Sequence, residues 1–397
     1  MILPPNLPIS ALSVSLIAQI HEHKGALRAM NNLSAARLLA LRQVATMESV
    51  AAGVRLGSVV LSDTEVRTVL GMLKHRQEAS QLAADIELPA EDAKRQNLAS
   101  VLDDLSAEPL ADYEIEALLM NQGGEARVFN ADEEQAAGYY EALNCVLSLA
   151  PLRTLTEEHL HELHRTLLAH SKKDVWHAGK YKASANHRSF NNPDTGARTV
   201  LPAAAPADAQ AKLVQLLEWL QAERDNPSQH PLLTIAAFIA GFQAIRPYQD
   251  GNVRMGLLLT RLLLQGGYSQ VAYSSLESQF ERDRDTYYTA LDRTLAGIET
   301  ATPHWEPWTA FFLSSLVDHA RRLFSKLERD KEIFSALPKL SSEIVNLARE
   351  HGRVTMADAI KLTGSNRNTL KLHFRKLVHE GRLLRHGMGA GVWYQPR

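Results

Sequence analysis

A ten-residue segment near the middle of the chain brings together side chains that can bind phosphate. Residues 245–254 read Ile-Arg-Pro-Tyr-Gln-Asp-Gly-Asn-Val-Arg and lie between two long apolar runs. Arg246, Asp250 and Arg254 supply two guanidiniums and one carboxylate. At the start of a helix, where backbone N–H groups are free, such groups can hold a phosphate and its Mg²⁺. The alternative is a plain turn between two hydrophobic helices.

The elements that position this segment are expected to be helical. Apolar residues recur at helical spacing through most of the chain, as in residues 213–220. The exception is residues 179–202, where a turn cluster at 191–196 separates two β-capable runs, 181–190 and 198–201. We therefore expect a mainly α fold: a helical bundle with one β-hairpin, followed by a C-terminal α+β domain.

The segment resembles the signature loop of the Fic (fido-fold) family, HPFxDGNGRxxR, whose members mostly transfer AMP from ATP to a protein hydroxyl. The residues that match this pattern are Pro247, Asp250, Gly251, Asn252 and Arg254, with Tyr248 in place of the phenylalanine. The resemblance implies a Fic helical bundle that uses ATP with Mg²⁺, in which Asp250 binds the metal. It also implies that the phosphates are bound by Gly251, Asn252 and Arg254.

Three positions depart from the signature. Arg246 stands where the catalytic histidine belongs, Val253 replaces the second loop glycine, and Leu257 replaces the final arginine. AMP transfer needs a base with a pKa near neutrality, whereas a guanidinium has a pKa above roughly 12 and no lone pair. A general base contributes about 10² to 10⁴-fold to the rate, so weak or no transfer is expected. Arg246 could instead clamp an anion or pair with Asp250, and the residues leave both open.

Flanking segments extend the resemblance to roughly residues 1–335. Residues 230–232, His-Pro-Leu, resemble the start of the family's helix before the loop. Residues 179–181, Gly-Lys-Tyr, and 201–202, Leu-Pro, resemble the bounds of its target-docking β-hairpin flap. His164 and Leu167 resemble the helix that precedes this flap. The ordered set is more specific than the loop alone.

An N-terminal segment, residues 50–66, resembles the family's inhibitory segment, typically VAASSRIEG…LSDTEV. In the family, the glutamate of that segment reaches the last arginine of the signature and blocks the γ-phosphate of the nucleotide. Here Gly57 stands at the glutamate position and Leu257 at the arginine position. Losing one partner of a buried ion pair costs about 3–5 kcal/mol, whereas losing both can be nearly neutral. The paired loss is what drift after loss of function would leave.

Three histidines at residues 159, 161 and 164 are a second candidate site. His161 and His164 share a helical face, but His159 does not, and the HExxH spacing of zinc enzymes is missing. We therefore expect a solvated helix surface, with metal binding as the alternative.

The C-terminal residues are electrostatically distinct from the rest. Residues 351–397 hold nine Lys or Arg and two Asp or Glu, a net charge of +7, whereas residues 1–350 carry −9. Because phosphate contacts supply most of the affinity for nucleic acid, this asymmetry indicates that only the tail meets a polyanion.

The tail also has a recognisable order of elements. Helical spacing, Gly364 as a stop and Ser365 or Asn366 as an N-cap predict three helices, followed by two strands joined by the glycine-rich residues 387–391. This order resembles the winged helix-turn-helix family, with the third helix as DNA reader and the glycine loop as wing. The residues assigned to DNA are Arg367, Asn368, Lys371, Arg375 and Arg385. A winged helix that docks protein is the alternative.

The composition is ordinary for a globular protein: 397 residues, 45% hydrophobic and 22% charged. The single cysteine, Cys145, forms no internal disulfide, and the N-terminus lacks a signal-peptide pattern, which favours the cytoplasm. The longest apolar stretch, residues 232–242, is about half a membrane span, so no membrane role is expected. We predict three parts, a helical segment with the degenerate inhibitory motif, a Fic core and a winged helix domain, at residues 1–95, 96–336 and 337–397.

These observations favour a Fic-like pseudoenzyme that senses a nucleotide and acts as a transcriptional or toxin–antitoxin-type regulator by binding duplex DNA. The alternative is a working nucleotidyl- or phosphotransferase that modifies a protein hydroxyl with another base. One winged helix makes few phosphate contacts, so we expect a homodimer on a two-fold DNA site. The sequence names neither the protein target nor the operator.

Overall fold

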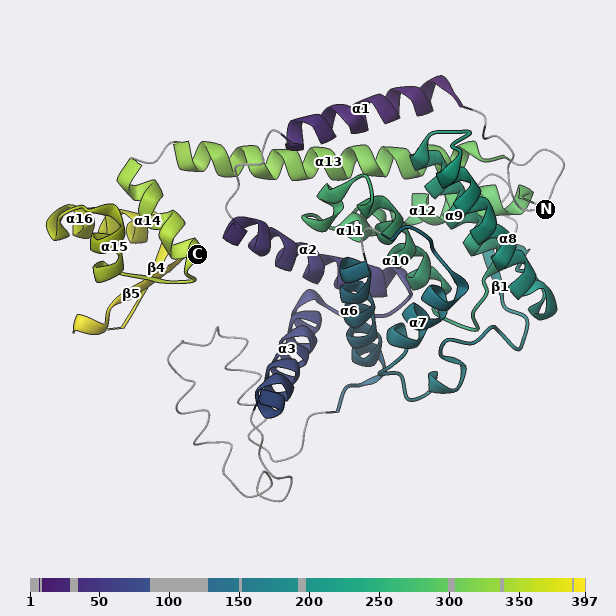
Figure 1. Ribbon diagram of the computed structural model, residues 1–397, viewed down its shortest axis with the longest axis horizontal. Helices are drawn as coiled ribbons and strands as arrows, with labels where there is room; N and C mark the ends of the chain where they lie inside the picture. The colour runs from purple at the N-terminus through teal and green to yellow at the C-terminus, as the bar shows by residue number, and fades with distance from the viewer. Residues whose placement is uncertain are drawn as a thin grey trace, which may run out of the picture. The chain divides into compact units, whose positions relative to one another are not determined.

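The computed structural model describes residues 7, 9–28, 35–85, 128–149, 152–191, 198–298, 304–335, 339–387 and 389–396. Within them the chain is mainly helical with two small antiparallel sheets, which confirms the predicted class (Figure 1). The helices are α1 (Ala11–Arg28), α2 (Ala35–Leu56), α3 (Asp63–Asp85), α6 (Ala131–Leu149), α7 (Glu157–Leu167), α8 (Pro206–Asp225), α9 (Pro231–Ile245), α10 (Asn252–Gln265), α11 (Leu276–Arg282), α12 (Arg284–Gly297), α13 (Glu306–Ser335), α14 (Lys339–Glu350), α15 (Met356–Thr363) and α16 (Arg367–His379). The strands are β1 (His187–Asn191), β2 (Arg198–Pro202), β3 (Val354–Thr355), β4 (Leu383–His386) and β5 (Trp393–Pro396).

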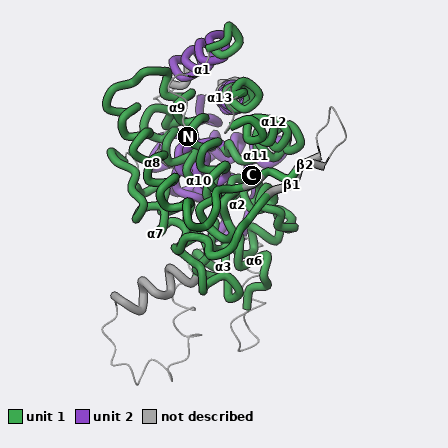
Figure 2. The backbone as a smooth tube through the Cα atoms, turned by 90° about the vertical axis from the view of Figure 1, so that its right-hand side faces the viewer, with its two compact units in different colours: residues 1–13, 46–271, 275–315 green, residues 14–45, 272–274, 316–397 purple. Residues whose placement is uncertain are grey.

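The chain divides into two compact units, drawn in green and purple in Figure 2. Unit 1 is residues 1–13, 46–271 and 275–315, and unit 2 is residues 14–45, 272–274 and 316–397. The predicted domain boundaries, after residues 95 and 336, lie outside the described residues. None of the described helices is both long and apolar enough to cross a membrane.

Two buried helices, α9 and α10, form the centre of unit 1. Every residue from 232 to 243 in α9 and from 254 to 264 in α10 is buried. A helix that is apolar all round must be covered by protein on all sides, and α9 meets this condition. Trp308 of α13 donates its indole N–H to the Ala236 carbonyl (2.8 Å), which ties a third helix to α9.

A buried polar network fixes α2 against α10. Arg261 of α10 pairs with Glu277 (Nη1 to Oε2, 3.1 Å) and donates to the Ser49 hydroxyl of α2 (2.9 Å). The Tyr139 hydroxyl donates to the same glutamate (3.4 Å). Arg261 and Glu277 are only 1% and 2% exposed at their side chains, so they depend on each other for compensation. This network positions the C-terminal end of α2 near the start of α10.

The predicted hairpin forms, with a shorter first strand than expected. β1 and β2 pair antiparallel, with His187 opposite Pro202 and Asn191 opposite Arg198. Most of the predicted turn, residues 192–196, lies outside the described residues. Residues 181–186 do not extend β1. They run beside the ten-residue segment instead, where Tyr181 forms a β-bridge with the chain at position 248.

Residues 339–396 of unit 2, the C-terminal module, have their own core. Three helices, α14, α15 and α16, accompany a three-stranded antiparallel sheet of order β3-β5-β4. The core residues are Ile344, Val345, Ala348, Val354, Ala359, Leu370, Phe374, Leu377 and Leu383, each at most 3% exposed. Gly364 ends α15 at φ 66°, and Asn366 is the N-cap of α16. The three predicted helices and the two predicted strands are present, but residues 354–355, expected to begin the second helix, form an additional strand that pairs with β5.

Candidate functional site

The ten-residue segment reverses the chain between α9 and α10. The first helix ends one residue before Arg246, whose N–H donates to the Phe242 carbonyl (2.9 Å) from a left-handed conformation, φ 47° and ψ 65°. Gly251 is also left-handed, at φ 75°, immediately before α10. A Cβ at this glycine would lie 3.4 Å from His164 Nε2, so both its φ and its surroundings favour glycine. The reversal leaves the backbone N–H groups at the start of α10 beside the loop.

Asn252, the first residue of α10, holds the loop together. Its Oδ1 accepts from the Tyr248 N–H (3.1 Å), and its Nδ2 donates to the Tyr248 carbonyl (2.7 Å). Gln243 of α9 donates to the Asn252 carbonyl (2.8 Å). The Asn252 side chain is 2% exposed and is engaged at both ends. In this structure the Asn252 amide organises the loop. Phosphate binding by Asn252, which the sequence led us to expect, stays a prediction.

Arg254 places a nearly buried guanidinium under the loop. It is 2% exposed, and its Nη2 lies 3.5 Å from Oδ2 of Asp250, whose side chain is 56% exposed. Its Nη1 has no hydrogen-bond partner among the described residues. Burial lowers the pKa of Arg254, and the Asp250 carboxylate opposes that shift. A buried guanidinium with one nitrogen unsatisfied can donate a hydrogen bond to an anion.

Gly57 lies beside Arg254. A Cβ at position 57 would lie 3.0 Å from Cγ and 3.2 Å from Cδ of Arg254, just after α2 ends at Leu56. The next residue, Ser58, is left-handed at φ 75°. The resemblance to the family's inhibitory segment pairs Gly57 with position 257. Leu257 is 2% exposed and lies within the core around α10. The structure therefore brings the N-terminal segment to the loop, with Arg254 as the neighbour of Gly57.

His164 of α7 lies directly behind the loop and has no free ring nitrogen. Its Nδ1 accepts from the Gly179 N–H (2.9 Å), so its Nε2 carries the proton and donates to the Asp250 carbonyl (3.2 Å). Its ring stacks on Tyr248 at 3.9 Å. Burial lowers the pKa of His164 to about 3. The imidazole is therefore neutral and ties the loop to the segment before the hairpin.

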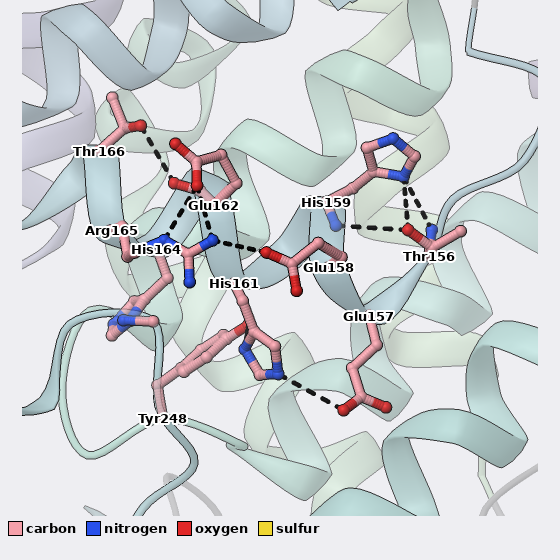
Figure 3. Close-up of polar contacts among 11 residues, drawn as sticks. Thr156, Glu157, Glu158, His159, His161, Glu162, His164, Arg165, Thr166 and Tyr248 are labelled. Carbon is pink, nitrogen blue, oxygen red and sulfur yellow. Dashed lines mark hydrogen bonds and ion pairs between the residues drawn. The ribbon is translucent and has the colours of Figure 1, made fainter.

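Of the other two histidines of α7, only His161 contacts the loop (Figure 3). His159 faces the helix N-terminus, where its Nδ1 lies 2.7 Å from the Thr156 hydroxyl. His161 Nδ1 lies 3.2 Å from the Tyr248 hydroxyl, and its Nε2 lies 3.5 Å from Glu157. Nowhere in the described residues do three His, Cys, Asp or Glu side chains gather as a metal site would require. The expectation of a solvated helix surface is wrong for His164, which is fully buried.

Lys182, which the sequence analysis did not single out, clamps the other side of the loop. Its Nζ donates to the Ile245 carbonyl (3.0 Å) and to Asn186 Oδ1 (2.8 Å). Asn186 in turn donates to the Tyr248 carbonyl (2.7 Å). Burial, and then the nearby Arg246 guanidinium, lower the pKa of Lys182 to about 8. Lys182 directly follows residues 179–181, which resemble the start of the family's flap, and this position was the sequence signal that could have identified it.

The residues assigned to DNA are all exposed on the C-terminal module. Arg367, Asn368, Lys371 and Arg375 lie on α16, and Arg385 lies on β4. The opposite face of α16 is packed into the module core. The side chains that would contact a polyanion are therefore available to solvent. α16 and the loop belong to different units.

Comparisons with known proteins agree with the architecture. Residues 154–264 match the profile of the Fic/DOC family. The fold is similar to that of a Fic family protein from Desulfovibrio desulfuricans, with 17% identity and a TM-score of 0.59 over 100% of this chain and 98% of that one. It is also similar to Fic-1 from C. elegans, with 15% identity and a TM-score of 0.51 over 81% of this chain and 74% of that one. The protein therefore has the fold of Fic proteins, and residues 154–264 are its Fic/DOC family domain.

Proposed function

We propose that this chain is a Fic-family regulator without efficient AMP transfer, whose loop binds a nucleotide and whose C-terminal module binds DNA. Arg246 carries the proposal, because it stands where the family signature has its catalytic base and a guanidinium accepts no proton near neutral pH. His164, which contacts the loop backbone, does not replace that base. Both nitrogens of His164 are already engaged, by Gly179 and by the Asp250 carbonyl.

Retained nucleotide binding is supported by the unsatisfied Nη1 of Arg254 at the start of α10. Asp250 offers an exposed carboxylate, a hard oxygen ligand of the kind that Mg²⁺ prefers. Arg254 would hold a phosphate, and the left-handed Gly251 would let the backbone approach it closely. Mg²⁺, when bound with ATP, would neutralise phosphate charge that the single buried guanidinium leaves uncompensated.

An active transferase with another base is the second candidate, and Lys182 is the residue that favours it. Its pKa is lowered to about 8, so an appreciable fraction of the amine is neutral near physiological pH. A neutral amine that donates its two N–H groups, as to Ile245 and Asn186, keeps one lone pair. Against this role, the lysine is only 3% exposed and a target hydroxyl would have to displace its neighbours.

Incubation with ATP labelled on its α-phosphate tests both candidates. Filter binding reports nucleotide bound without transfer, whereas label that survives denaturation reports self-modification. The regulator proposal expects reversible, Mg²⁺-dependent binding and no stable label. Stable label that disappears in Lys182→Met, in a variant that still binds nucleotide, would favour the transferase instead.

The DNA-binding part of the proposal is supported by charge and exposure. The module has the helix and strand order of a winged helix, and residues 351–397 carry a net charge of +7. The exposed cations of α16 and β4 suit phosphates and base edges. We further propose a cytoplasmic homodimer that represses or activates a two-fold site. Gel shifts of the full chain at several salt concentrations test this part, and absence of binding at low salt would leave protein docking as the role of the module.

A further inference from the structure

The outward ridge of α16 consists of Asn368, Leu372, Arg375 and His379. The inward face of this helix is marked by Leu370, Phe374 and Leu377, each 0% exposed. At about 100° per residue, the four ridge residues point directly away from that face. All four are exposed. The ridge is therefore the part of the helix that a partner would meet first.

Leu372 is the unusual member of this ridge. It is 69% exposed, more than Leu362 (54%), Leu384 (41%) or Ile360 (38%) of the same module. The module core is complete without it. A single exposed leucine needs no explanation by itself, but this one lies beside the cations Lys371 and Arg375 on the helix proposed to read DNA.

Asn368 lies one helical turn before Leu372 and is available for contact. The neighbouring Asn366 is not, because its carboxamide accepts from the N–H of Thr369 as the N-cap (2.9 Å). In the major groove, asparagine pairs with adenine N6 and N7, and apolar side chains contact the thymine methyl group. Residues near the start of a reading helix are those that reach base edges.

We propose that Asn368 and Leu372 read neighbouring adenine and thymine bases in the major groove of duplex DNA. The proposal rests on the DNA-binding role proposed above. Four helical residues span about 6 Å along the axis, which is less than two base-pair steps of about 3.4 Å. The two side chains therefore fall on base pairs that are no more than two steps apart. The net charge of +7 on residues 351–397 favours DNA over a second copy of this module, which would carry the same charge.

The test uses the full chain and a duplex selected by it from a random library. Replacing thymine by uracil in that duplex removes only the methyl group. This change should weaken wild-type binding about fourfold and leave Leu372→Ala unchanged. Replacing adenine by 7-deazaadenine removes N7, which should weaken the wild type about tenfold and leave Asn368→Ala unchanged. Leu362→Ala, an exposed leucine on α15, is the matched control and should respond to both base changes like the wild type.

Each other outcome overturns the proposal in a distinguishable way. Equal sensitivity to uracil in the wild type and in Leu372→Ala would refute the methyl contact while DNA binding itself stands. A wild-type dimer that becomes monomeric in Leu372→Ala, by sedimentation, would assign the leucine to contact between copies. If no duplex is retained even at low salt, the DNA-binding role and this proposal both fail.

Discussion

Gly57 and Arg254 are neighbours, so the N-terminal segment reaches the loop through a residue without a side chain. A Cβ at position 57 would lie 3.0 Å from Arg254 Cγ. The guanidinium beyond that contact keeps Nη1 without a hydrogen-bond partner among the described residues. A longer acidic side chain at position 57 would therefore meet Arg254 directly and could neutralise it after a small shift of the arginine side chain.

Gly57→Glu should suppress nucleotide binding. The new carboxylate would enter beside Arg254 and compete with phosphate for its guanidinium, so we expect at least a tenfold loss of affinity by calorimetry with Mg²⁺ and ATP. Gly57→Ala is the matched control. It adds the close Cβ contact without the charge and should keep affinity within about threefold. Equal losses in both variants would mean that crowding, and not charge, controls the site.

Arg246→His alone should not restore strong AMP transfer. Val253 and Leu257 would remain where the family signature has glycine and arginine, so the nucleotide would be badly placed for a restored base. The triple variant Arg246→His, Val253→Gly, Leu257→Arg should exceed the single variant by about 10-fold or more in label transfer from ATP. A single variant as active as the triple would refute this explanation.

Asp250→Ala should abolish the Mg²⁺-dependent part of nucleotide binding. The exposed carboxylate is the hard oxygen ligand of the loop, and its loss also removes the ion pair with Arg254. Asp208→Ala, an exposed aspartate on α8, is the control and should bind normally in the same titration. If the wild type binds no nucleotide at millimolar concentration, the sensor role is wrong and a scaffold role remains.

His164 should make stability fall on acidification. Its pKa is about 3 in the folded protein against an ordinary 6.5, so protons bind the unfolded chain first as the pH falls. Its contribution is complete above pH 6.5 and is lost progressively toward pH 3, by about 2 kcal/mol at pH 5. Urea denaturation at pH 7.5 and 5.0 should show a smaller loss in His164→Gln than in the wild type. Equal losses would show that other groups control the acid sensitivity.

Residues 337–397, expressed alone, should fold, because the C-terminal module contains its own buried core. About 60 residues is near the lower limit for independent stability, so circular dichroism with a thermal melt is the measurement. In the full chain, Arg367→Ala and Lys371→Ala should relax sequence preference. Arg385→Ala should weaken binding to all sequences alike. DNA binding that is unchanged when the module is deleted would refute its role.

The helical class, the presence of a hairpin and the three helices of the C-terminal module followed from the sequence alone. These features depend on local pattern: apolar residues at helical spacing over 213–220, or Gly364 followed by the Asn366 cap. The sequence also located the loop, because a proline, an aspartate and a glycine between two apolar runs are visible in ten residues. Such signals require no knowledge of what packs on the other side.

Which side chains are free to act depends on the packing of segments that are distant in the sequence. The sequence treats Asn252 and His164 as polar residues available for ligands, yet the fold engages the first with Tyr248 and buries the second behind Asp250. Lys182 and Gly57 lie far from the loop in sequence and contact it in space. Burial and hydrogen-bond partnership depend on this long-range packing, and these two properties set whether a group is charged, engaged or able to bind.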